Sequence, residues 1–252
     1  MSLIFRPQTE KRKIGPVYVD VLESIAAIDT ISVSMRRQEP ILVTFSNAHT
    51  VNIARNDSEL RKSLEMALVL NDGAGLDLAS QILYGEPFPE NLNGTDFCPK
   101  LLEAAGSDAR VYLLGGEAGI AEKAAAEICL RYPYVTVVGS RNGYFDPKES
   151  EQILEEVLAA GANLLLVGMG QPRQEIWAAQ HFASFPGAVI CVGALLDFLA
   201  GKFPRAPMLI RKMRLEWAFR LFKEPRRLAR RYLIGNFLFV ATTLTQKFAG
   251  VR

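Results

Sequence analysis

Residues 164–201 read LLLVGMGQPRQEIWAAQHFASFPGAVICVGALLDFLAG, and this stretch predicts the fold. It contains two apolar runs, residues 164–167 and 188–192, each of a length typical of a buried strand. Both runs end in glycines and polar side chains, and a helical segment through Trp177 follows the first. The two runs therefore deliver these residues to one edge of a sheet, and in parallel α/β sheets ligands bind at that edge.

The same alternation of strand and helix continues along the chain. Strands are predicted at residues 17–22, 41–45, 111–114 and 135–138. Helices are predicted at residues 24–37, from 48 onward, 57–70, 74–84, 95–105, 117–131 and 147–160, and residues 1–14 are interpreted as a mobile arm. This order predicts an α/β fold: a Rossmann-like, doubly wound, mainly parallel sheet with helices on both faces.

Length and composition limit the class of protein. The chain has 252 residues, of which 49% are apolar, so a large core can form. Its three cysteines are widely spaced, which fits neither a disulfide framework nor a zinc site and indicates a reducing compartment. The first residues lack a signal-peptide pattern, and no apolar run reaches about 20 residues. We therefore expect a cytoplasmic protein without a membrane-spanning helix.

Charge divides the chain into two unequal parts. Residues 202–231 hold eleven Lys and Arg and two Glu, a net charge of +9, whereas residues 1–201 have a net charge of −9. We expect residues 1–201 to form the α/β catalytic domain and residues 202–252 to form a helical basic appendage. Such a basic block indicates an anionic partner, which is a nucleic acid, a phosphate or a membrane surface.

The appendage also has an apolar, aromatic end. Residues 208–222 and 225–249 are predicted to be helical, and arginines recur from Arg226 to Arg231 at spacings that form one basic face. The apolar stretch that follows is too short to span a bilayer. A basic helix that continues into an apolar one is typical of an element lying in the membrane interface. A helix packed on the body, or a dimer contact, fits the same pattern.

Asp72 lies in a glycine-flanked turn, Asn71-Asp72-Gly73-Ala74-Gly75, directly before a predicted helix. It either caps that helix or forms a carboxylate held close to a ligand. Asn47, after the strand at residues 41–45, is a plausible helix cap, and Thr95 or Asp96 is expected to cap the helix that ends near residue 105.

Ten short motifs, in this order, together resemble the WecG/TagA/CpsF family of bacterial glycosyltransferases over about residues 17–232. The motifs are Asn47-Ala48, Asp72-Gly73-x-Gly75, Asn93-Gly94-Thr95-Asp96, Leu114-Gly115-Gly116, Gly143-Tyr144-Phe145, the run from Val167 to Glu175, Val192-Gly193-Ala194-x-x-Asp197, Gly201-x-x-x-Arg205-Ala206-Pro207, Leu215-Glu216-Trp217-x-x-Arg220-Leu221 and Glu224-Pro225-x-Arg227-x-x-Arg230-Arg231-Tyr232.

The resemblance implies a metal-independent, inverting enzyme without a cofactor. Such an enzyme moves a hexose or N-acetylhexosamine from a UDP-sugar to a polyprenyl-diphosphate-linked sugar at the inner face of the plasma membrane. It also implies that Asp72 is the general base. One position departs from the family: many members have Thr-x-Asn after the early strand, and here Phe45 takes the place of that threonine. Ser46 is the expected substitute.

Inverting glycosyl transfer requires a base for the acceptor hydroxyl and stabilisation of the departing diphosphate. Asp72 is the predicted base, with His49 and Asp197 as alternatives. The predicted cations for the diphosphate are Arg205, Arg227 and Arg230, from a pool that includes Arg220 and Arg231. The backbone N–H groups of the Gly168 and Gly193 turns are expected to assist.

The predicted substrate-binding residues lie at the ends of strands and the starts of helices. They are Ser46, Asn47, Asn93, Thr95, Asp96, Gly115, Tyr144, Gly168, Gly170, Gln171, Gln174, Glu175, Gly193 and Asp197, with Tyr144, Gln171, Gln174 and Asp197 assigned to uridine and ribose. No Asp-x-Asp pair follows a predicted strand, although Asp72, Asp96 and Asp197 remain able to converge on a metal in three dimensions.

Several alternatives stay open on the sequence. The donor sugar is a neutral hexose, N-acetylmannosamine or the uronic acid of the latter. A non-catalytic module that binds nucleotides or RNA is a different class, although no RNA-binding motif is present. An oxidoreductase is disfavoured because the G-x-G-x-x-G pattern is missing. The expected partners are the donor, the lipid-linked acceptor and an anionic membrane, without nucleic acid, and a homo-oligomer is compatible with the sequence.

Overall fold

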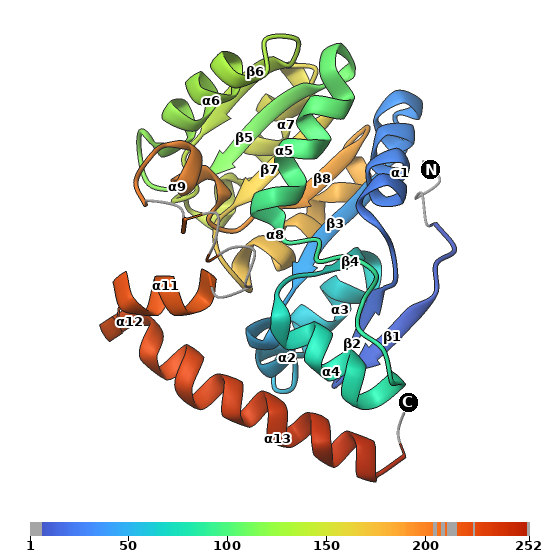
Figure 1. Cartoon of the computed structure of the whole chain (residues 1–252). Helices are drawn as coiled ribbons and strands as arrows, with labels where there is room; N and C mark the ends of the chain where they lie inside the picture. Colours follow the sequence, from blue (N-terminus) through green and yellow to red (C-terminus); the bar gives the residue numbers. More distant parts are fainter. Residues whose placement is uncertain (1–6, 204–205, 208–209, 211–215, 224, 251–252) are drawn as a thin grey trace.

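The computed structural model describes residues 7–203, 206–207, 210, 216–223 and 225–250. Six parallel strands form the central sheet in the order β4-β3-β8-β7-β5-β6, with helices on both faces (Figure 1). The strands are β3 (Ile41–Ser46), β4 (Leu68–Asn71), β5 (Arg110–Gly115), β6 (Thr136–Arg141), β7 (Leu164–Gly168) and β8 (Ala188–Cys191). This arrangement confirms the predicted Rossmann-like fold.

The helices divide between the two faces of the sheet or follow its C-terminal end. They are α1 (Ser24–Arg37), α2 (Ala48–Ala54), α3 (Ser58–Met66), α4 (Ala74–Tyr84), α5 (Gly94–Ala105), α6 (Ile120–Arg131), α7 (Ser150–Ala159), α8 (Arg173–His181), α9 (Leu195–Leu199), α11 (Glu216–Lys223), α12 (Pro225–Ala229) and α13 (Gly235–Phe248). A π-helical turn, Arg230–Ile234, joins α12 to α13. Within the described residues, no helix has the length and apolar character needed to cross a membrane.

Side-chain alternation along the strands explains the continuous apolar runs in the sequence. In β7, Leu164 and Leu166 point into one hydrophobic core, while Leu165 and Val167 point into the other. Helices α1, α5 and α6 cover the first core, and α3, α4, α7 and α8 cover the second. A parallel strand that is buried on both faces has no need of polar residues at every second position.

The N-terminal segment is more ordered than the sequence predicts. Strands β1 (Lys11–Ile14) and β2 (Val17–Asp20) pair antiparallel, so the prediction of a mobile arm is wrong for residues 11–14. Ile14 is fully buried, and the buried Arg12 guanidinium donates to the Ser80 hydroxyl at 2.6 Å. These contacts come from helix α4, more than 60 residues away in the chain, and such long-range contacts are not readable from a short local pattern.

The edge strand β4 is a second correction. Residues 68–70 were expected to belong to the helix predicted at 57–70, but α3 ends at Met66 and Ala67 is extended. Residues 68–71 then pair with β3, and all four are buried. Three apolar residues followed by an asparagine are too few to distinguish a strand from a helix by periodicity. Pairing with β3 makes this segment a strand.

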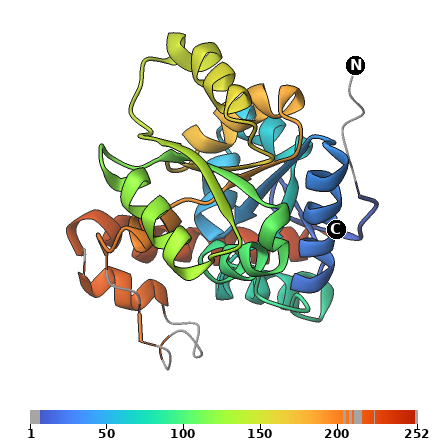
Figure 2. The same cartoon turned by 90° about the horizontal axis from the view of Figure 1, so that it is seen from above.

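The C-terminal half of the appendage is helical, as predicted for residues 225–249. Helix α13 lies along α2 and α4 (Figure 1), and seen from above it passes beneath the body (Figure 2). Phe239 is buried, and Asn52 Nδ2 donates to Gly235 O at 2.7 Å. Gly15 N donates to Gln246 Oε1 at 2.8 Å. The interpretation of a helix packed on the body is therefore confirmed for one face of α13.

The direction in which consecutive strands are added to the sheet reverses between β5 and β7. The helix after β5 leads outward to β6, whereas the helix after β7 leads to β8 on the other side, so a crevice opens at the carboxyl ends of these neighbours. Glycine lets the turns stack there. A Cβ on Gly115 would lie 2.4 Å from Gly168 O, and a Cβ on Gly168 would lie 2.9 Å from Gly193 O.

Replacing Gly115 with alanine tests this backbone stacking. We expect Gly115→Ala to lower the thermal midpoint by several degrees, since overpacking typically costs about 1–3 kcal/mol. Gly106→Ala is the control, because its φ of +49° strains alanine but no atom lies within 4 Å of the added carbon. Differential scanning calorimetry should show the larger loss for Gly115→Ala, and equal losses would refute the steric explanation.

Candidate functional site

The carboxyl ends of the strands surround a cavity of about 380 Å³, which we call the strand-end cavity. The turns after β3, β6, β7 and β8 and the start of α5 contribute to its walls. Sequence-predicted residues that line it include Tyr144, Gly168, Gly170, Gln171, Gln174, Gly193 and Asp197. The structure thus brings together the polar ends of strands that the sequence assigned to one edge.

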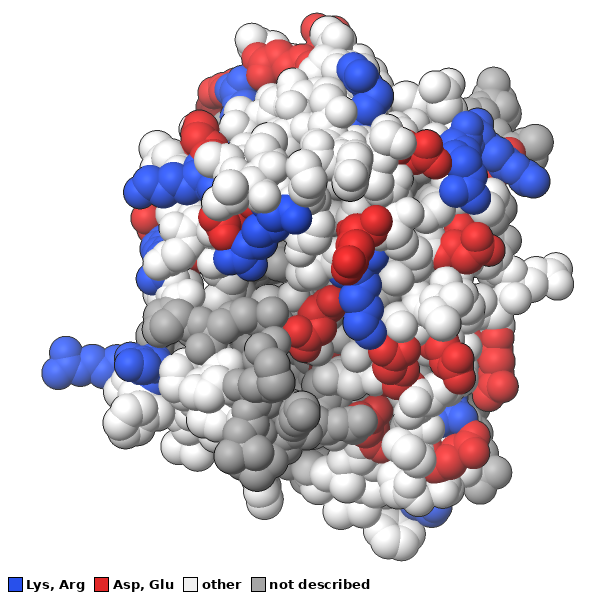
Figure 3. All heavy atoms as spheres, turned by 45° about the horizontal axis from the view of Figure 1, so that its top comes forward, with Lys and Arg blue, Asp and Glu red and all other residues white. Residues whose placement is uncertain are grey.

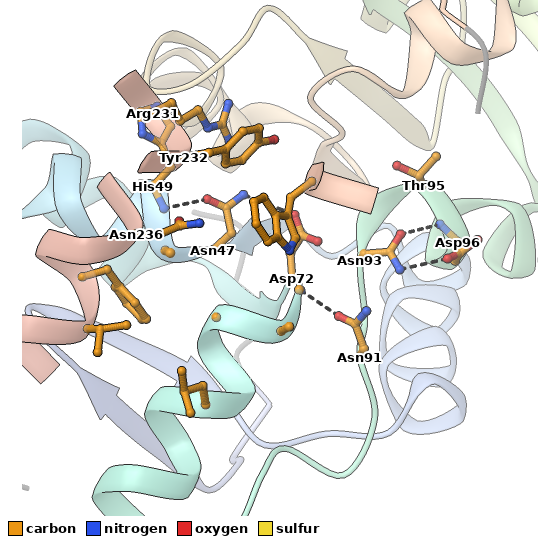
Figure 4. A pocket seen from close by; sticks show the side chains of 18 residues that line it. Asn47, His49, Asp72, Asn91, Asn93, Thr95, Asp96, Arg231, Tyr232 and Asn236 are labelled. Atoms are coloured by element: carbon orange, nitrogen blue, oxygen red, sulfur yellow. Dashed lines mark hydrogen bonds between the residues drawn. The ribbon is translucent and has the colours of Figure 1, made fainter. Parts of the chain in front are cut away.

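A second cavity, of about 340 Å³, lies beside the first and is called the helix-side cavity. The start of α4 and the residues Asn91, Asn93 and Asp96 form one wall. Side chains from the C-terminal helices form the other, as Figure 4 shows for Tyr232 and Asn236. The appendage therefore closes a cavity that the α/β body alone leaves open on that side.

The two cavities meet at a shared set of side chains. The residues that line both are Asn47, His49, Asp72, Thr95 and Arg231. They come from the turns after β3 and β4, the start of α5 and the π-helical turn. Asp72 is thus accessible from either cavity, and Figure 4 shows it among amide side chains.

Hydrogen bonds to two segments, the end of β3 and the loop before α5, hold the Asp72 turn. The Asp72 backbone N–H donates to Ser46 O at 2.7 Å, and Gly73 N donates to Asn91 Oδ1 at 2.8 Å. The Asp72 carboxylate accepts from Asn47 Nδ2 at 3.2 Å. Gly73 is the N-cap of α4, so the interpretation of Asp72 as the capping residue is wrong.

Asn47 has both the structural role and a place in the site. Its Oδ1 accepts from His49 N at 3.0 Å and from Thr50 N at 3.2 Å, which confirms the predicted cap of α2. Its Nδ2 is then directed to Asp72. At α5 the cap is Asn93, whose Oδ1 accepts from Asp96 N at 3.0 Å, so the prediction of a Thr95 or Asp96 cap is wrong.

His49 is electrically neutral at neutral pH. Burial, with a smaller contribution from the positive charge of Arg231, lowers its pKa to about 4. The imidazole therefore enters both cavities as a hydrogen-bonding group without a charge.

Three of the predicted binding residues do not line either cavity. Ser46 and Glu175 are buried, with 0% and 1% of their surfaces exposed, and Gly115 supports the turn beneath Gly168. Alternation along β3 explains Ser46: Phe45 faces the strand-end cavity, so its neighbour points to the other side of the sheet. Ser46 therefore does not replace the threonine that the family pattern places in the pocket.

The predicted cations are only partly described. Arg205 lies outside the described residues, as do the side chains of Arg220, Arg227 and Arg230. Arg231 lines both cavities, and Lys202 and Arg173 line the strand-end cavity. Lys202 Nζ lies 3.0 Å from Glu117 and 3.5 Å from Asp197, which places an ion-pair network at that cavity's wall.

Asp72, Asp96 and Asp197 do not converge. Among the described residues, no group of three or more His, Cys, Asp or Glu side chains is arranged to hold a metal ion. The alternative of a site built from these three carboxylates is therefore not supported by their positions.

Several site residues were not predicted from the sequence. They are Thr50, which bonds to Gln171, and the helix-side residues Asn91, Trp217, Tyr232 and Asn236. Thr50 had a local signal, because the Asn47-x-x-Thr50 spacing is that of a capping box. Trp217 and Tyr232 lie within motifs of the family resemblance, although no site role was predicted for them. Asn91 and Asn236 lie on distant segments that meet only in the folded chain.

The fold and the site define an α/β protein with a ligand cavity at the carboxyl edge of a parallel sheet and an adjoining cavity covered by C-terminal helices. Residues 12–252 match the model of the glycosyl transferase WecG/TagA/CpsF family. Since this match spans nearly the whole chain, the chain belongs to this family, and its role is that of a glycosyltransferase in polysaccharide synthesis.

The pKa of His49 has a measurable consequence for stability. The unfolded chain takes up the proton near pH 6.5, before the folded protein does near pH 4, so stability falls as the pH drops through this window. We expect His49→Gln to lose less stability than the wild type between pH 7.5 and pH 4.5. Thermal midpoints measured across this range test it, and parallel curves for the two proteins would contradict it.

Proposed function

We propose that the protein is an inverting glycosyltransferase that moves a hexose or N-acetylhexosamine from a UDP-sugar to a polyprenyl-diphosphate-linked sugar. The reaction would take place at the inner face of the bacterial plasma membrane, in the synthesis of a surface polysaccharide. Residues 1–201 would form the catalytic domain, and residues 202–252 would complete the site and dock it on the membrane. Family membership supports the reaction class of glycosyl transfer.

The observation that carries the proposal is the position of Asp72 where the two cavities meet. A transfer reaction needs two substrates with one base between them. The strand-end cavity would hold the donor, since nucleotides bind at this edge of parallel sheets. The helix-side cavity would hold the acceptor sugar, whose hydroxyl groups match the amides of Asn47, Asn91 and Asn93.

In this mechanism Asp72 accepts the proton of the acceptor hydroxyl as that oxygen attacks the anomeric carbon. The new glycosidic bond forms while the bond from the anomeric carbon to the diphosphate oxygen breaks, and the UDP leaves with the electron pair. Positioned proton transfer of this kind contributes roughly 10²–10⁴ in rate. Asn47 would orient the Asp72 carboxylate through the hydrogen bond at 3.2 Å.

The departing diphosphate would be stabilised by cationic side chains. Arg231 and Lys202 are positioned for this in the strand-end cavity, and Arg205, Arg227 and Arg230 remain proposed partners. The N–H groups of Gly170 and Gly193 already donate to Gln174 Oε1 at 3.2 Å. These two N–H groups are therefore poor candidates for the phosphate, which increases the demand on the arginines.

We propose that the strand-end cavity recognises the uridine and ribose of the donor. Tyr144, Gln171 and Asp197 are proposed contacts for uridine and ribose, because they line the strand-end cavity. A neutral hexose, N-acetylmannosamine and its uronic acid are all candidates. Slow UDP release from a panel of UDP-sugars, followed by transfer to synthetic polyprenyl-diphosphate acceptors, distinguishes them.

The outer face of α13 supports membrane docking. Phe237 and Phe248 are 77% and 86% exposed, and Leu238 on α13 and Leu233 and Ile234 on the preceding π-helical turn are also exposed. The opposite face of the same helix packs on the body. On the face of the molecule in Figure 3, acidic and basic side chains of the body are interspersed, so the excess positive charge of residues 202–231 is the stronger attraction for anionic lipid.

Asp72→Asn tests the base. We expect turnover to fall by roughly 10²–10⁴, since the amide cannot take the proton, while donor binding by calorimetry stays within a few-fold of wild type. Asp146→Asn is the control, because Asp146 is exposed and lines neither cavity. Near-normal turnover of Asp72→Asn would move the role of base to His49 or Asp197.

Phe237→Ser combined with Phe248→Ser tests membrane docking. Because both rings are exposed and line neither cavity, we expect an unchanged thermal midpoint. Binding to vesicles with anionic lipid should fall roughly 10- to 100-fold, because two rings that would insert into the bilayer are lost. Leu130→Ser, an equally exposed apolar residue on α6, should bind like the wild type, and undiminished binding of the double variant would contradict the docking face.

A further inference from the structure

One amide oxygen ties two strand-end turns together. Gln174 Oε1 accepts hydrogen bonds from Gly170 N and from Gly193 N, both at 3.2 Å. Gly170 follows β7 and Gly193 follows β8, so the Gln174 side chain bridges two walls of the strand-end cavity. Only 2% of Gln174 is exposed, so most of this side chain is part of the wall.

The direction of the Gln174 amide follows from its partners. Two backbone N–H groups point at the same atom, and only an oxygen can accept from both. The amide nitrogen must then point the other way, where it donates to Glu175 Oε1 at 2.7 Å. Thr44 Oγ1, on β3, approaches that same carboxyl oxygen at 3.4 Å. Glu175 is therefore the acceptor that keeps the Gln174 amide in its orientation.

The Glu175 carboxyl is isolated from solvent. It is 1% exposed and lines neither cavity, and its Oε2 has no hydrogen-bond partner among the described residues. Burial is the largest influence on this group and raises its pKa. Hydrogen bonds from Gln174, Gln171 and Thr44 oppose that shift without overcoming it. The carboxyl keeps an oxygen that accepts hydrogen bonds in either protonation state.

A line of hydrogen bonds runs from Gln171, in the turn after β7, to Asp72. Gln171 Nε2 donates to Thr50 Oγ1 at 2.9 Å, and Thr50 Oγ1 lies 3.3 Å from Asn47 Oδ1. Asn47 Nδ2 donates to Asp72 at 3.2 Å. Side chains from the β7 turn and α2 therefore connect the walls of the strand-end cavity to the candidate base.

We infer that Glu175 is a positioning residue for the donor: its carboxyl oxygen fixes the Gln174 amide, which holds the turns after β7 and β8 at the spacing that the donor requires. Glu175 itself touches neither substrate. The inference rests on the proposed function, in which the strand-end cavity takes the UDP-sugar. It assigns the Gln174-Glu175 pair a role in shaping the cavity rather than two separate ligand contacts.

Two substitutions at Glu175 separate shape from hydrogen bonding. Glu175→Gln keeps a carbonyl oxygen for Gln174 and Thr44, so its donor KM and kcat should stay within about threefold of wild type. Glu175→Met fills similar space without an acceptor, and its donor KM should rise roughly tenfold or more with a smaller change in kcat. A wild-type KM in Glu175→Met, or an equally impaired Glu175→Gln, would overturn the inference.

A double-variant comparison tests whether Glu175 acts through Gln174. If it does, Glu175→Met should change the donor KM by less than about twofold when introduced into Gln174→Met. Effects that multiply would overturn the inference. Ser150→Ala is the matched control. It removes the acceptor of a buried hydrogen bond, at 3.2 Å, from Trp177, which lies on α8 as Glu175 does, and it leaves the two turns unchanged. It should lower the thermal midpoint and leave the donor KM unchanged.

Hydrogen exchange provides a readout that needs no substrate. The Gly170 and Gly193 amides should exchange faster in Glu175→Met than in the wild type or Glu175→Gln, because the acceptor Gln174 Oε1 is no longer held in place. Unchanged protection would refute the positioning role. If the wild-type protein turns over no UDP-sugar, the proposed function fails, whereas the exchange result still decides whether Glu175 orders the turns.

Discussion

The close approach of backbone turns at the carboxyl edge of the sheet is the constraint on which the site depends. The turns after β5, β7 and β8 lie so near one another that side chains at Gly115 and Gly168 would collide with carbonyl oxygens. With no side chains between them, these turns leave their inner surfaces to the strand-end cavity. The Gln174 amide then bonds two of the turns together, so sterics and hydrogen bonding define the same wall.

The second cavity depends on a contact between the two ends of the chain. Helix α13 packs on α2 and α4, its Gln246 side chain accepts a hydrogen bond from the turn of the β1–β2 hairpin, and the preceding π-helical turn brings Arg231 to the walls of both cavities. A site closed in this way uses a basic appendage for two purposes. It brings the positive charge of Arg231 to both cavities, and in our proposal the apolar face that it leaves exposed docks on a membrane.

Local sequence patterns predicted long elements with a clear repeat of apolar residues. They failed for short segments whose secondary structure depends on tertiary contacts. The helix at residues 24–37 and the Asn47 cap are confirmed because amphipathic spacing and cap chemistry are local properties. Strand β4 was missed because four residues carry no period. Residues 11–14 pair with the nearby strand β2, but their misreading as a mobile arm reflects the buried contact of Arg12 with Ser80 on α4, which lies far away in the chain. Glu175 was expected to contact ligand, but its side chain points inward to Thr44.

By itself, the sequence determined the α/β class, the glycine turns and the family, because each depends on short motifs of residues adjacent in the chain. Only the tertiary structure decided that Asn47, His49, Asp72, Thr95 and Arg231 meet between two cavities. It also decided that Glu175 supports Gln174 from behind the cavity wall. These contacts join segments from β3 to the appendage. Parallel strands and a packed C-terminal helix bring together residues that are far apart in the chain, and no local sequence pattern predicts contacts of that kind.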